Sequence, residues 1–210
     1  TTSHPKDMTN DLIEVYKRSN KLMPLVHLPV QSGSNKILKL MNRNHSIENY
    51  LETFNKLKEI NSKIEFSSDF IIAYPGEENQ DFEDTLNLIK KVKFINSYSY
   101  IFSPRPGTVS GKLNLIDKKS SFERLEIIQN ELFENQIQKN KSLENSIVEV
   151  LVENFTEDKT KTFGRSKHMT SVIFDGKKSD IGKIVQVKIS KSNRSTLFGE
   201  IVDNSNQKVA

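Results

Sequence analysis

Polar side chains that could bind a ligand follow an apolar segment in the run His27–Ser34. Residues 26–30 predict a short buried strand, and Gln31, Ser32 and Ser34 come directly after it. In barrel-type α/β enzymes, groups at the carboxyl ends of strands bind the ligand. The spacing alone leaves two interpretations open: these residues are hydrogen-bond partners of a polar ligand, or they are ordinary turn residues.

A second group of polar residues, Ser67, Ser68 and Asp69, interrupts an apolar segment that predicts a strand at 64–73. Burying such groups costs free energy unless they are hydrogen-bonded. Pairing within the protein is therefore the first interpretation, and a ligand-binding role for Ser68 and Asp69 is the second.

Two arginines could recognise anions. Arg105 lies between Pro104 and Pro106, so its loop holds it stiffly, and a guanidinium group in such a loop suits phosphate or carboxylate recognition. Arg43 could bind a carboxylate, although an arginine at the end of a helix is more often a surface or capping residue.

Other chemistry is not indicated by the spacing. The chain has no cysteine, and its four histidines are scattered without the spacing of a zinc or iron site. Neither His4 nor His27 is paired by sequence with a nucleophile. No segment approaches the ~20 apolar residues that cross a bilayer, so we expect a cytoplasmic protein. The chain begins at Thr1 without methionine, and we expect it to be a fragment or an excised piece.

The elements that must position these residues alternate between strand and helix. A helix is predicted over 10–19, and Ser34, Ser46 and Asn79 are expected to cap three more. This alternation is typical of βα units with a parallel sheet. The predicted strands are 26–30, 64–73 and 97–102, and a long helix at about 120–141 is expected to bury Phe122, Leu125, Ile128, Leu132, Phe133 and Ile137.

The pattern changes near Leu143, where short alternating segments replace helices. Five short strands with turns between them predict a small OB-like β-barrel. We therefore expect two domains, 1–141 and 142–204, and a frayed tail at 205–210. The five predicted strands are 147–152, 161–167, 171–174, 183–189 and 196–202.

Basic residues concentrate in this second part. Between Lys159 and Arg194 there are ten basic residues against two acidic ones, which favours a surface that binds RNA phosphates over a merely solvated surface. The phenylalanines among them are interpreted mainly as core residues and secondarily as platforms for base stacking. The expected RNA contacts are Lys161, Arg165, Lys167, Lys183 and Lys188, and the phenylalanines are Phe155, Phe163, Phe174 and Phe198.

Several motifs together resemble a known family. They are Thr2–Pro5, His27–Ser34, Met41–Arg43 with His45, 67–72, Tyr74–Glu77 and Ser103–Thr108. With these motifs the chain resembles the MiaB-type tRNA methylthiotransferases, which are radical S-adenosylmethionine enzymes. The C-terminal barrel resembles the TRAM domain. The resemblance implies an α/β partial (βα) barrel, the C-terminal part of a radical SAM domain, followed by that all-β barrel.

The resemblance implies an enzyme with S-adenosylmethionine and two 4Fe-4S clusters. One cluster would cleave S-adenosylmethionine to a radical that abstracts hydrogen from carbon 2 of isopentenyl-adenosine next to the anticodon, and the second would supply a methylated sulfur. The tRNA anticodon stem-loop would be the partner of a monomer. By position, the cofactor side would consist of Gln31, Ser32, Ser34, Ser68 and Asp69, and the substrate side of Arg43 and Arg105.

One departure from the family limits what this chain does alone. Iron–sulfur clusters are held by cysteine thiolates, and this chain has none, so we expect it to be inactive without the rest of the enzyme and to contain no metal ligand. Alternative functions are a stand-alone RNA-binding remnant, or a methylthiotransferase acting on threonylcarbamoyl-adenosine or on a ribosomal protein.

Overall fold

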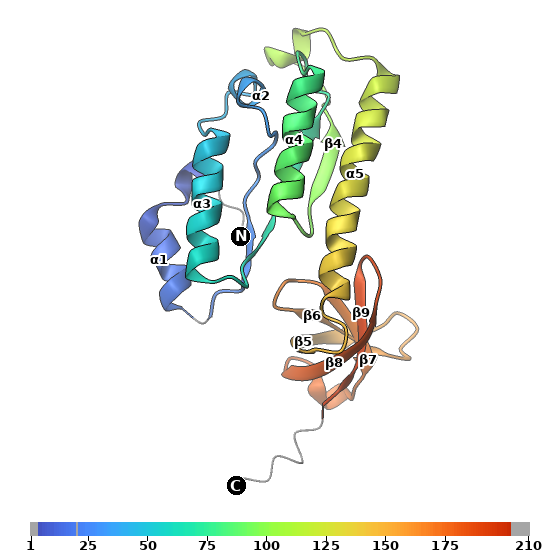
Figure 1. The fold of residues 1–210 in the computed structure, drawn as a ribbon. Coiled ribbons are helices and arrows are strands. Elements are labelled where there is room, and N and C mark those ends of the chain that lie inside the picture. The colour runs from blue at the N-terminus through green and yellow to red at the C-terminus, as the bar shows by residue number, and fades with distance from the viewer. Residues whose placement is uncertain (1–3, 20, 203–210) are drawn as a thin grey trace. The chain divides into compact units, whose positions relative to one another are not determined.

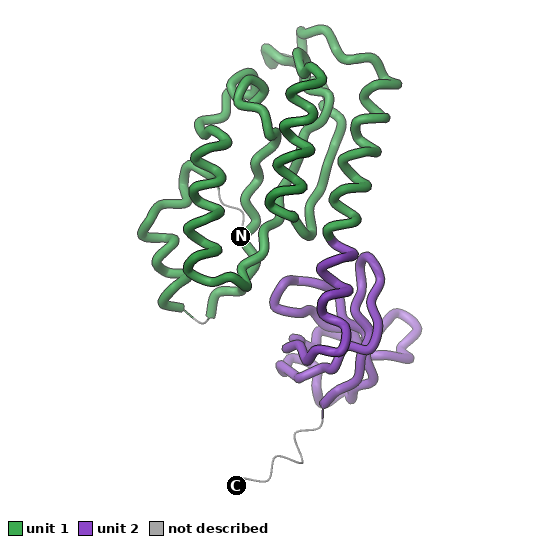
Figure 2. The backbone as a smooth tube through the Cα atoms, viewed as in Figure 1, with its two compact units in different colours: residues 1–135 green, residues 136–210 purple. Residues whose placement is uncertain are grey.

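Short parallel strands backed by helices form the first of two units in the computed structural model, which describes residues 4–19 and 21–202 (Figures 1 and 2). The units divide between residues 135 and 136. The tail expected at 205–210 lies outside the described residues. In order, the first unit contains η1 (Pro5–Asp7), α1 (Asn10–Arg18), β1 (Leu25–His27), α2 (Asn35–Leu40), α3 (Ile47–Ile60), β2 (Glu65–Ser67), β3 (Asp69–Ile72), α4 (Asn79–Val92), β4 (Tyr98–Ile101), η2 (Ser110–Lys112) and most of α5 (Lys118–Lys141).

The helix starts follow from local capping. Ser34 and Ser46 cap α2 and α3 as expected, because each hydroxyl accepts the backbone N–H three residues later at 3.3 Å. The expected cap of α4 was wrong by one residue: Glu78, not Asn79, is the N-cap. The Asp81 carboxylate reaches back and accepts the Glu78 N–H at 2.9 Å, which closes a capping box.

The strands are parallel but shorter than expected. β1 pairs with β2 and β3 pairs with β4, so the segment expected as one strand at 64–73 is interrupted at Ser68, while Gln31 keeps the chain after β1 paired with β3. The Ser68 N–H donates to the Ser97 hydroxyl at 2.9 Å instead of to a strand carbonyl. β1 ends at His27, before Pro29, which has no N–H, and the Val30 N–H donates to the Ser68 hydroxyl at 2.9 Å.

One face of these strands forms the core of the first unit. Helices α3 and α4 lie side by side and cover that face (Figure 1). Val26, Leu28, Phe66, Phe70 and Ile72 alternate along the strands and are at most 2% exposed. Each such side chain stabilises the fold by about 1.5–3 kcal/mol, which fixes the direction in which the intervening residues point.

The intervening residues point to the opposite face, which is only partly covered. His27 and Asp69 are partly exposed there, and Tyr98 and Tyr100 are 60% and 57% exposed. The two tyrosine rings stack with 6.5 Å between their centroids. Within the described residues, this polar and aromatic face is therefore open to solvent or to further protein.

The apolar stripe expected on α5 was wrong in part. Ile128 and Leu132 are buried, but Phe122, Phe133 and Ile137 are 62%, 36% and 39% exposed. A helix turns about 100° per residue, so these three side chains point about 100° or more away from the direction of the two buried ones. The apolar residues of α5 are thus spread around the helix instead of forming one stripe.

A closed barrel of five strands forms the second unit, in the order β5-β6-β7-β9-β8, which confirms the expected barrel. The parallel pairing of β7 with β9 closes it, and all other pairs are antiparallel. The strands are β5 (Ile147–Phe155), β6 (Thr162–Ser166), β7 (Ser171–Asp175), β8 (Ile184–Ser192) and β9 (Thr196–Ile201). Its buried core consists of Val150, Val152, Val172, Phe174, Val187, Ile189 and Leu197. In the described part of the chain, no helix is long and apolar enough to span a membrane.

Candidate functional site

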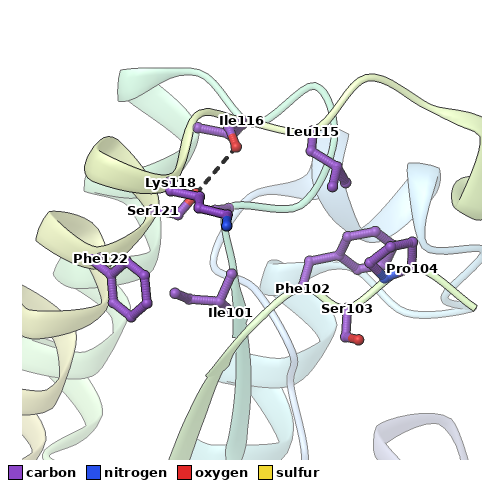
Figure 3. A pocket seen from close by; sticks show the side chains of 10 residues that line it. Ile101, Phe102, Ser103, Pro104, Leu115, Ile116, Lys118, Ser121 and Phe122 are labelled. Carbon is purple, nitrogen blue, oxygen red and sulfur yellow. Dashed lines mark hydrogen bonds between the residues drawn. The ribbon is translucent and has the colours of Figure 1, made fainter.

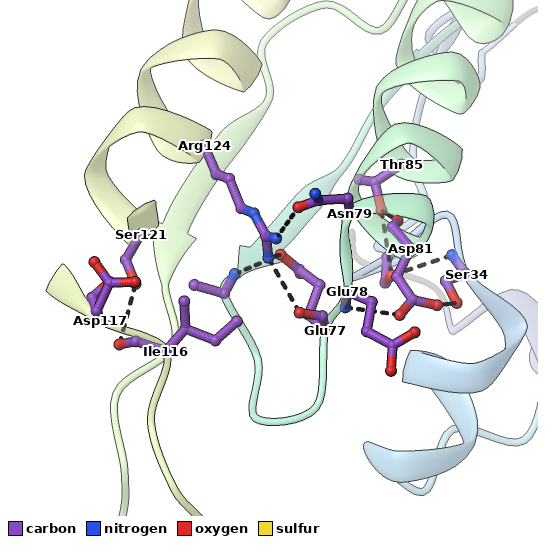
Figure 4. A network of polar contacts seen from close by, with 12 residues as sticks. Ser34, Glu77, Glu78, Asn79, Asp81, Thr85, Ile116, Asp117, Ser121 and Arg124 are labelled. Carbon is purple, nitrogen blue, oxygen red and sulfur yellow. Dashed lines mark hydrogen bonds and ion pairs between the residues drawn. The ribbon is translucent and has the colours of Figure 1, made fainter. Parts of the chain in front are cut away.

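The turn after β1 is fixed to helix α4 by its own polar groups (Figure 4). The Ser34 hydroxyl donates to Asp81 Oδ1 at 2.6 Å, and the Ser32 hydroxyl lies 3.3 Å from the Thr85 hydroxyl. The Gly33 N–H donates to the same Thr85 oxygen at 2.9 Å, and a Cβ on Gly33 would lie 2.5 Å from α4 backbone atoms. The hydroxyls of Ser32 and Ser34 thus hold the turn in position through hydrogen bonds within the protein.

Asp81 is the anchor of this turn. Its carboxylate is 8% exposed and accepts hydrogen bonds from Ser34, from the Glu78 N–H and from Lys36 Nζ, the last at 2.9 Å. Burial would raise the pKa of Asp81, but these hydrogen bonds outweigh it and hold the pKa below its usual value. The carboxylate therefore stays ionised and keeps the turn in place.

Gln31 differs from its serine neighbours. It is 8% exposed and has φ +74°, a left-handed conformation that costs a non-glycine residue on the order of 1–3 kcal/mol. Its backbone is paired: the N–H donates to the Asp69 carbonyl at 3.0 Å, and the carbonyl accepts from Ile71 at 2.9 Å. No described residue forms a hydrogen bond with its side-chain amide. A side-chain amide without a protein partner keeps its donors and its acceptor available for a ligand.

Ser68 and Asp69 have different environments. Ser68 is fully buried and its hydroxyl accepts the Val30 N–H, so pairing within the protein, the first of the two interpretations, is what the geometry shows. The Asp69 carboxylate is 33% exposed and lies 3.4 Å from His27 Nε2. The other ring nitrogen of His27 lies 2.8 Å from the Ser67 hydroxyl.

The sequence did not pair His27 with a hydroxyl group, whereas the structure places its ring beside Ser67. The parallel register places His27 directly opposite Ser67, and residue spacing along the chain carries no signal of it. The imidazole bridges Ser67 and Asp69 on the open face of the strands. It can orient the Asp69 carboxylate, which stays accessible.

A buried ion pair holds the turn after β3 (Figure 4). Glu77 Oε1 accepts from Arg124 Nη1 at 2.8 Å and from the Ala73 N–H at 3.2 Å, and Arg124 Nη2 donates to Asn79 Oδ1 at 2.8 Å. The side chains of Glu77 and Arg124 are 2% and 13% exposed. Burial raises the pKa of Glu77, and the Arg124 charge partly offsets that rise. Sequence reasoning missed this pair because 47 residues separate its members.

The two arginines considered for anion recognition lie at a helix end and in a loop. The Arg43 N–H donates to the Leu38 carbonyl at 2.8 Å just after α2, and its side chain is partly exposed. Arg105 is exposed, and its carbonyl accepts the Thr108 hydroxyl at 2.8 Å, which tightens the loop.

Acidic residues neutralise part of the basic surface on the barrel. Arg165 lies 3.4 Å from Glu153, and its guanidinium group is 5.5 Å from the centroid of the Phe163 ring. Lys167 pairs with Glu149. Both acids are on β5, outside the stretch whose charge predicted an RNA-binding surface. Surface pairs of this kind are weak, so they leave the basic groups able to exchange partners.

The other expected RNA contacts are also at the surface. Lys161 Nζ lies 2.7 Å from Asp175 Oδ1, while Lys183 and Lys188 are exposed. Phe174 is 2% exposed and belongs to the core, as the main interpretation of the phenylalanines expected, whereas Phe163 is only partly buried.

A metal site is not formed by the described residues, among which no group of three or more acidic or histidine side chains could hold an ion. Cysteine is absent from the whole chain.

Comparisons with known proteins bear on both units. Residues 1–89 match the family model of the radical SAM superfamily, and residues 141–202 match that of the TRAM domain. Coproporphyrinogen III oxidase from Escherichia coli, a radical SAM enzyme, aligns with 91% of this chain and 46% of its own at a TM-score of 0.54 and 14% identity, which indicates similarity of fold alone.

The relatives found by sequence are far more similar. A tRNA-2-methylthio-N(6)-dimethylallyladenosine synthase of Pelagibacter ubique is 68% identical over all 210 residues, and one of Rickettsia rickettsii is 47% identical over 204 residues, or 96% of this chain. The chain spans about half the length of these curated relatives, 47% and 46%. It carries a radical SAM region followed by a TRAM domain, and over its whole length it is closely similar to part of the tRNA-2-methylthio-N(6)-dimethylallyladenosine synthases.

Proposed function

We propose that this chain is part of a tRNA methylthiotransferase that adds a 2-methylthio group to N6-dimethylallyladenosine, also called isopentenyl-adenosine, beside the anticodon. The observation that carries the proposal is the 68% identity to the Pelagibacter synthase, which extends over both units. In this function, residues 1–141 form part of a (βα) barrel and residues 142–204 hold the tRNA. Such an enzyme acts on cytoplasmic tRNA.

The two kinds of cofactor fit this chain differently. In this family, S-adenosylmethionine supplies a radical when it binds beside an iron–sulfur cluster. Cluster iron needs cysteine thiolates, so this chain contributes none of its ligands. S-adenosylmethionine does fit, because the Gln31 amide has no hydrogen-bond partner among the described residues and the Asp69 carboxylate is accessible.

In this function some residues at the strand ends bind the cofactor and others position them. Gln31 and Asp69 bind polar groups of S-adenosylmethionine, and Ser32, Ser34 and Ser68 hold the turn that presents them. Direct contact of the serine hydroxyls with the cofactor would require them to share hydrogen bonds already made. Carboxyl ends of parallel strands are where such folds place their ligands.

The tRNA would contact both units. Arg43 and Arg105 are suited to phosphates or to polar groups of the nucleotide that reacts. On the barrel, lysine and arginine side chains would replace their acidic partners with phosphates, and release of counterions would drive that exchange. The residues with such partners are Lys161, Arg165 and Lys167, and the exposed Lys183 and Lys188 would bind phosphates as well.

Mass spectrometry of tRNA nucleosides tests the proposal. The full-length protein containing this chain is expressed in a bacterial strain that has lost its own methylthiotransferase. We expect N6-dimethylallyladenosine to become 2-methylthio-N6-dimethylallyladenosine, and Gln31→Ala to reduce that conversion strongly while Gln80→Ala, an exposed control on α4, does not. Unchanged nucleosides in the presence of soluble, cluster-loaded protein would refute it. A 2-methylthio group on threonylcarbamoyl-adenosine or on a ribosomal protein would assign another substrate.

A further inference from the structure

A pocket of about 400 Å³ opens at the carboxyl ends of β3 and β4 (Figure 3). Ala73, which follows β3, and Ile101, the last residue of β4, line it together with the segment that leads into α5. The volume lies in the range of small-molecule sites, ~300–1,000 Å³. Because these strands are parallel to β1, the pocket is at the same edge of the sheet as Gln31.

Its lining is mostly apolar. Ile101, Phe102 and Leu115 contribute apolar side chains, and Phe122 projects from α5 on the other side (Figure 3). Leu115 and Phe122 are 55% and 62% exposed, although they border a concave site. Exposed large apolar side chains around a pocket indicate a ligand or partner with an apolar part. Lys118, also in the lining, adds one cation.

Contacts with residues outside the pocket fix the positions of two of its lining residues, Phe102 and Ala73. The Phe102 ring packs edge-to-face on Tyr74, with 4.8 Å between centroids, and the Tyr74 hydroxyl donates to the Leu40 carbonyl at 3.1 Å. Ala73 has φ +57°, and its N–H is fixed by Glu77. A site fixed in this way costs little ordering free energy when a ligand enters.

We propose that this pocket receives the dimethylallyl group of N6-dimethylallyladenosine and so makes the enzyme prefer the alkylated nucleotide. The inference rests on the proposed function, from which it takes the substrate. The group is branched, uncharged and made of five carbons, which suits an apolar pocket, and Lys118 is available for a phosphate of the same nucleotide. Gln31 and the pocket would then serve the cofactor and the alkyl group from one edge of the sheet.

Binding of two synthetic anticodon stem-loops tests the inference, one with N6-dimethylallyladenosine and one with unmodified adenosine. Dissociation constants are measured for the full-length protein and for Leu115→Asn and Phe122→Asn. The control is Ile127→Asn, because Ile127 is also exposed on α5, at 46%, and does not line the pocket. One methylene in an apolar pocket changes discrimination about 10–200-fold, so each pocket variant should lose at least about tenfold of the preference for the alkylated stem-loop. Affinity for the unmodified stem-loop should not change.

The outcomes separate the inference from the function it rests on. Equal preference in the pocket variants and in Ile127→Asn, or no preference in the unaltered protein, overturns the inference. Methylthiolation of the alkylated stem-loop by the unaltered protein is measured in parallel. If no 2-methylthio product forms, the proposed function fails, while the binding ratios still decide whether the pocket recognises the alkyl group. Thermal unfolding of each variant checks that the three substitutions leave the fold equally stable.

Discussion

Replacing Arg124 with alanine removes the cation that neutralises a buried carboxylate. Glu77 is 2% exposed at its side chain, and Arg124 Nη1 lies 2.8 Å from it. The same guanidinium group donates to the Glu77 carbonyl at 3.2 Å and to Asn79 at 2.8 Å. The substitution therefore leaves a carboxylate in a place that water reaches poorly, at the turn that ends β3.

The expected loss of stability follows from that geometry. Breaking a buried ion pair by removing one partner costs about 3–5 kcal/mol, because the remaining charge is uncompensated. The hydrogen bond to Asn79 adds little, because it is exposed and water can replace the donor. For a chain of this size, 1 kcal/mol shifts the melting temperature by about 2–4 °C, so Arg124→Ala should lower it by roughly 6–20 °C.

The loss should depend on pH in a definite direction. Burial already raises the pKa of Glu77, and without Arg124 only the hydrogen bond from the Ala73 N–H opposes that rise. Between the unfolded and the folded pKa, the folded variant binds more protons than the unfolded chain, so its stability falls as pH rises. The difference from the unaltered protein should thus be largest near neutral pH and shrink as pH falls toward the ordinary pKa of a glutamic acid.

Urea unfolding followed by far-UV circular dichroism measures both effects. Lys119→Ala is the matched control, because it removes the same charge from the same helix at a side chain that is 87% exposed. It should cost less than about 1 kcal/mol. A loss for Arg124→Ala that equals this control, or one that does not vary with pH, would refute the reasoning. Adding Glu77→Gln to Arg124→Ala should recover part of the loss near neutral pH.

Three other variants test separate parts of the chain. Ser34→Ala removes the cap of α2 and a hydrogen bond to buried Asp81, and should cost about 2–3 kcal/mol in urea unfolding. Gly164→Ala places a Cβ 2.4 Å from a carbonyl oxygen of β5, and should lower barrel stability by about 1–3 kcal/mol or more. Charge reversal to Glu at Arg165 and Lys167 should weaken tRNA binding and reduce the slope of log affinity against log salt by roughly 0.9 for each phosphate that the variant no longer neutralises; an unchanged slope would remove these residues from the interface.

Local signals in the sequence predicted much of the fold. Helix starts at Ser34 and Ser46 depend on hydrogen bonds within four residues, so residue types alone reveal them. The five barrel strands follow from alternation, which is equally local. The segment 64–73 was predicted as one strand. Its interruption at Ser68 was not predicted, because it depends on hydrogen bonds of Ser68 with Val30 and Ser97.

What the sequence did not predict arises from pairing over long separations. The net charge of residues 159–194 predicted a more basic surface than the structure has. Glu149 and Glu153, on the neighbouring strand, pair with Lys167 and Arg165. The exposure of Phe122 likewise depends on which side of α5 packs against the core, and an apolar residue count does not reveal that. That same exposure places Phe122 at the pocket beside β4.

Position at a strand end identified the candidate ligand-binding residues. It did not distinguish residues that hydrogen-bond within the protein from residues that are available to a ligand. The hydroxyls of Ser32, Ser34 and Ser68 bind protein atoms, and breaking those bonds would leave buried groups unpaired at a cost of ~1–3 kcal/mol each. A ligand that displaced them would have to offset that cost, whereas one that binds Gln31 satisfies an amide no described residue pairs with. The strained backbone of Gln31 also supports a ligand-binding role. Its left-handed conformation costs free energy that a glycine at this position would not have cost, and the protein has a glutamine there. Gln31 is therefore the residue at this edge whose substitution should change ligand binding most and stability least.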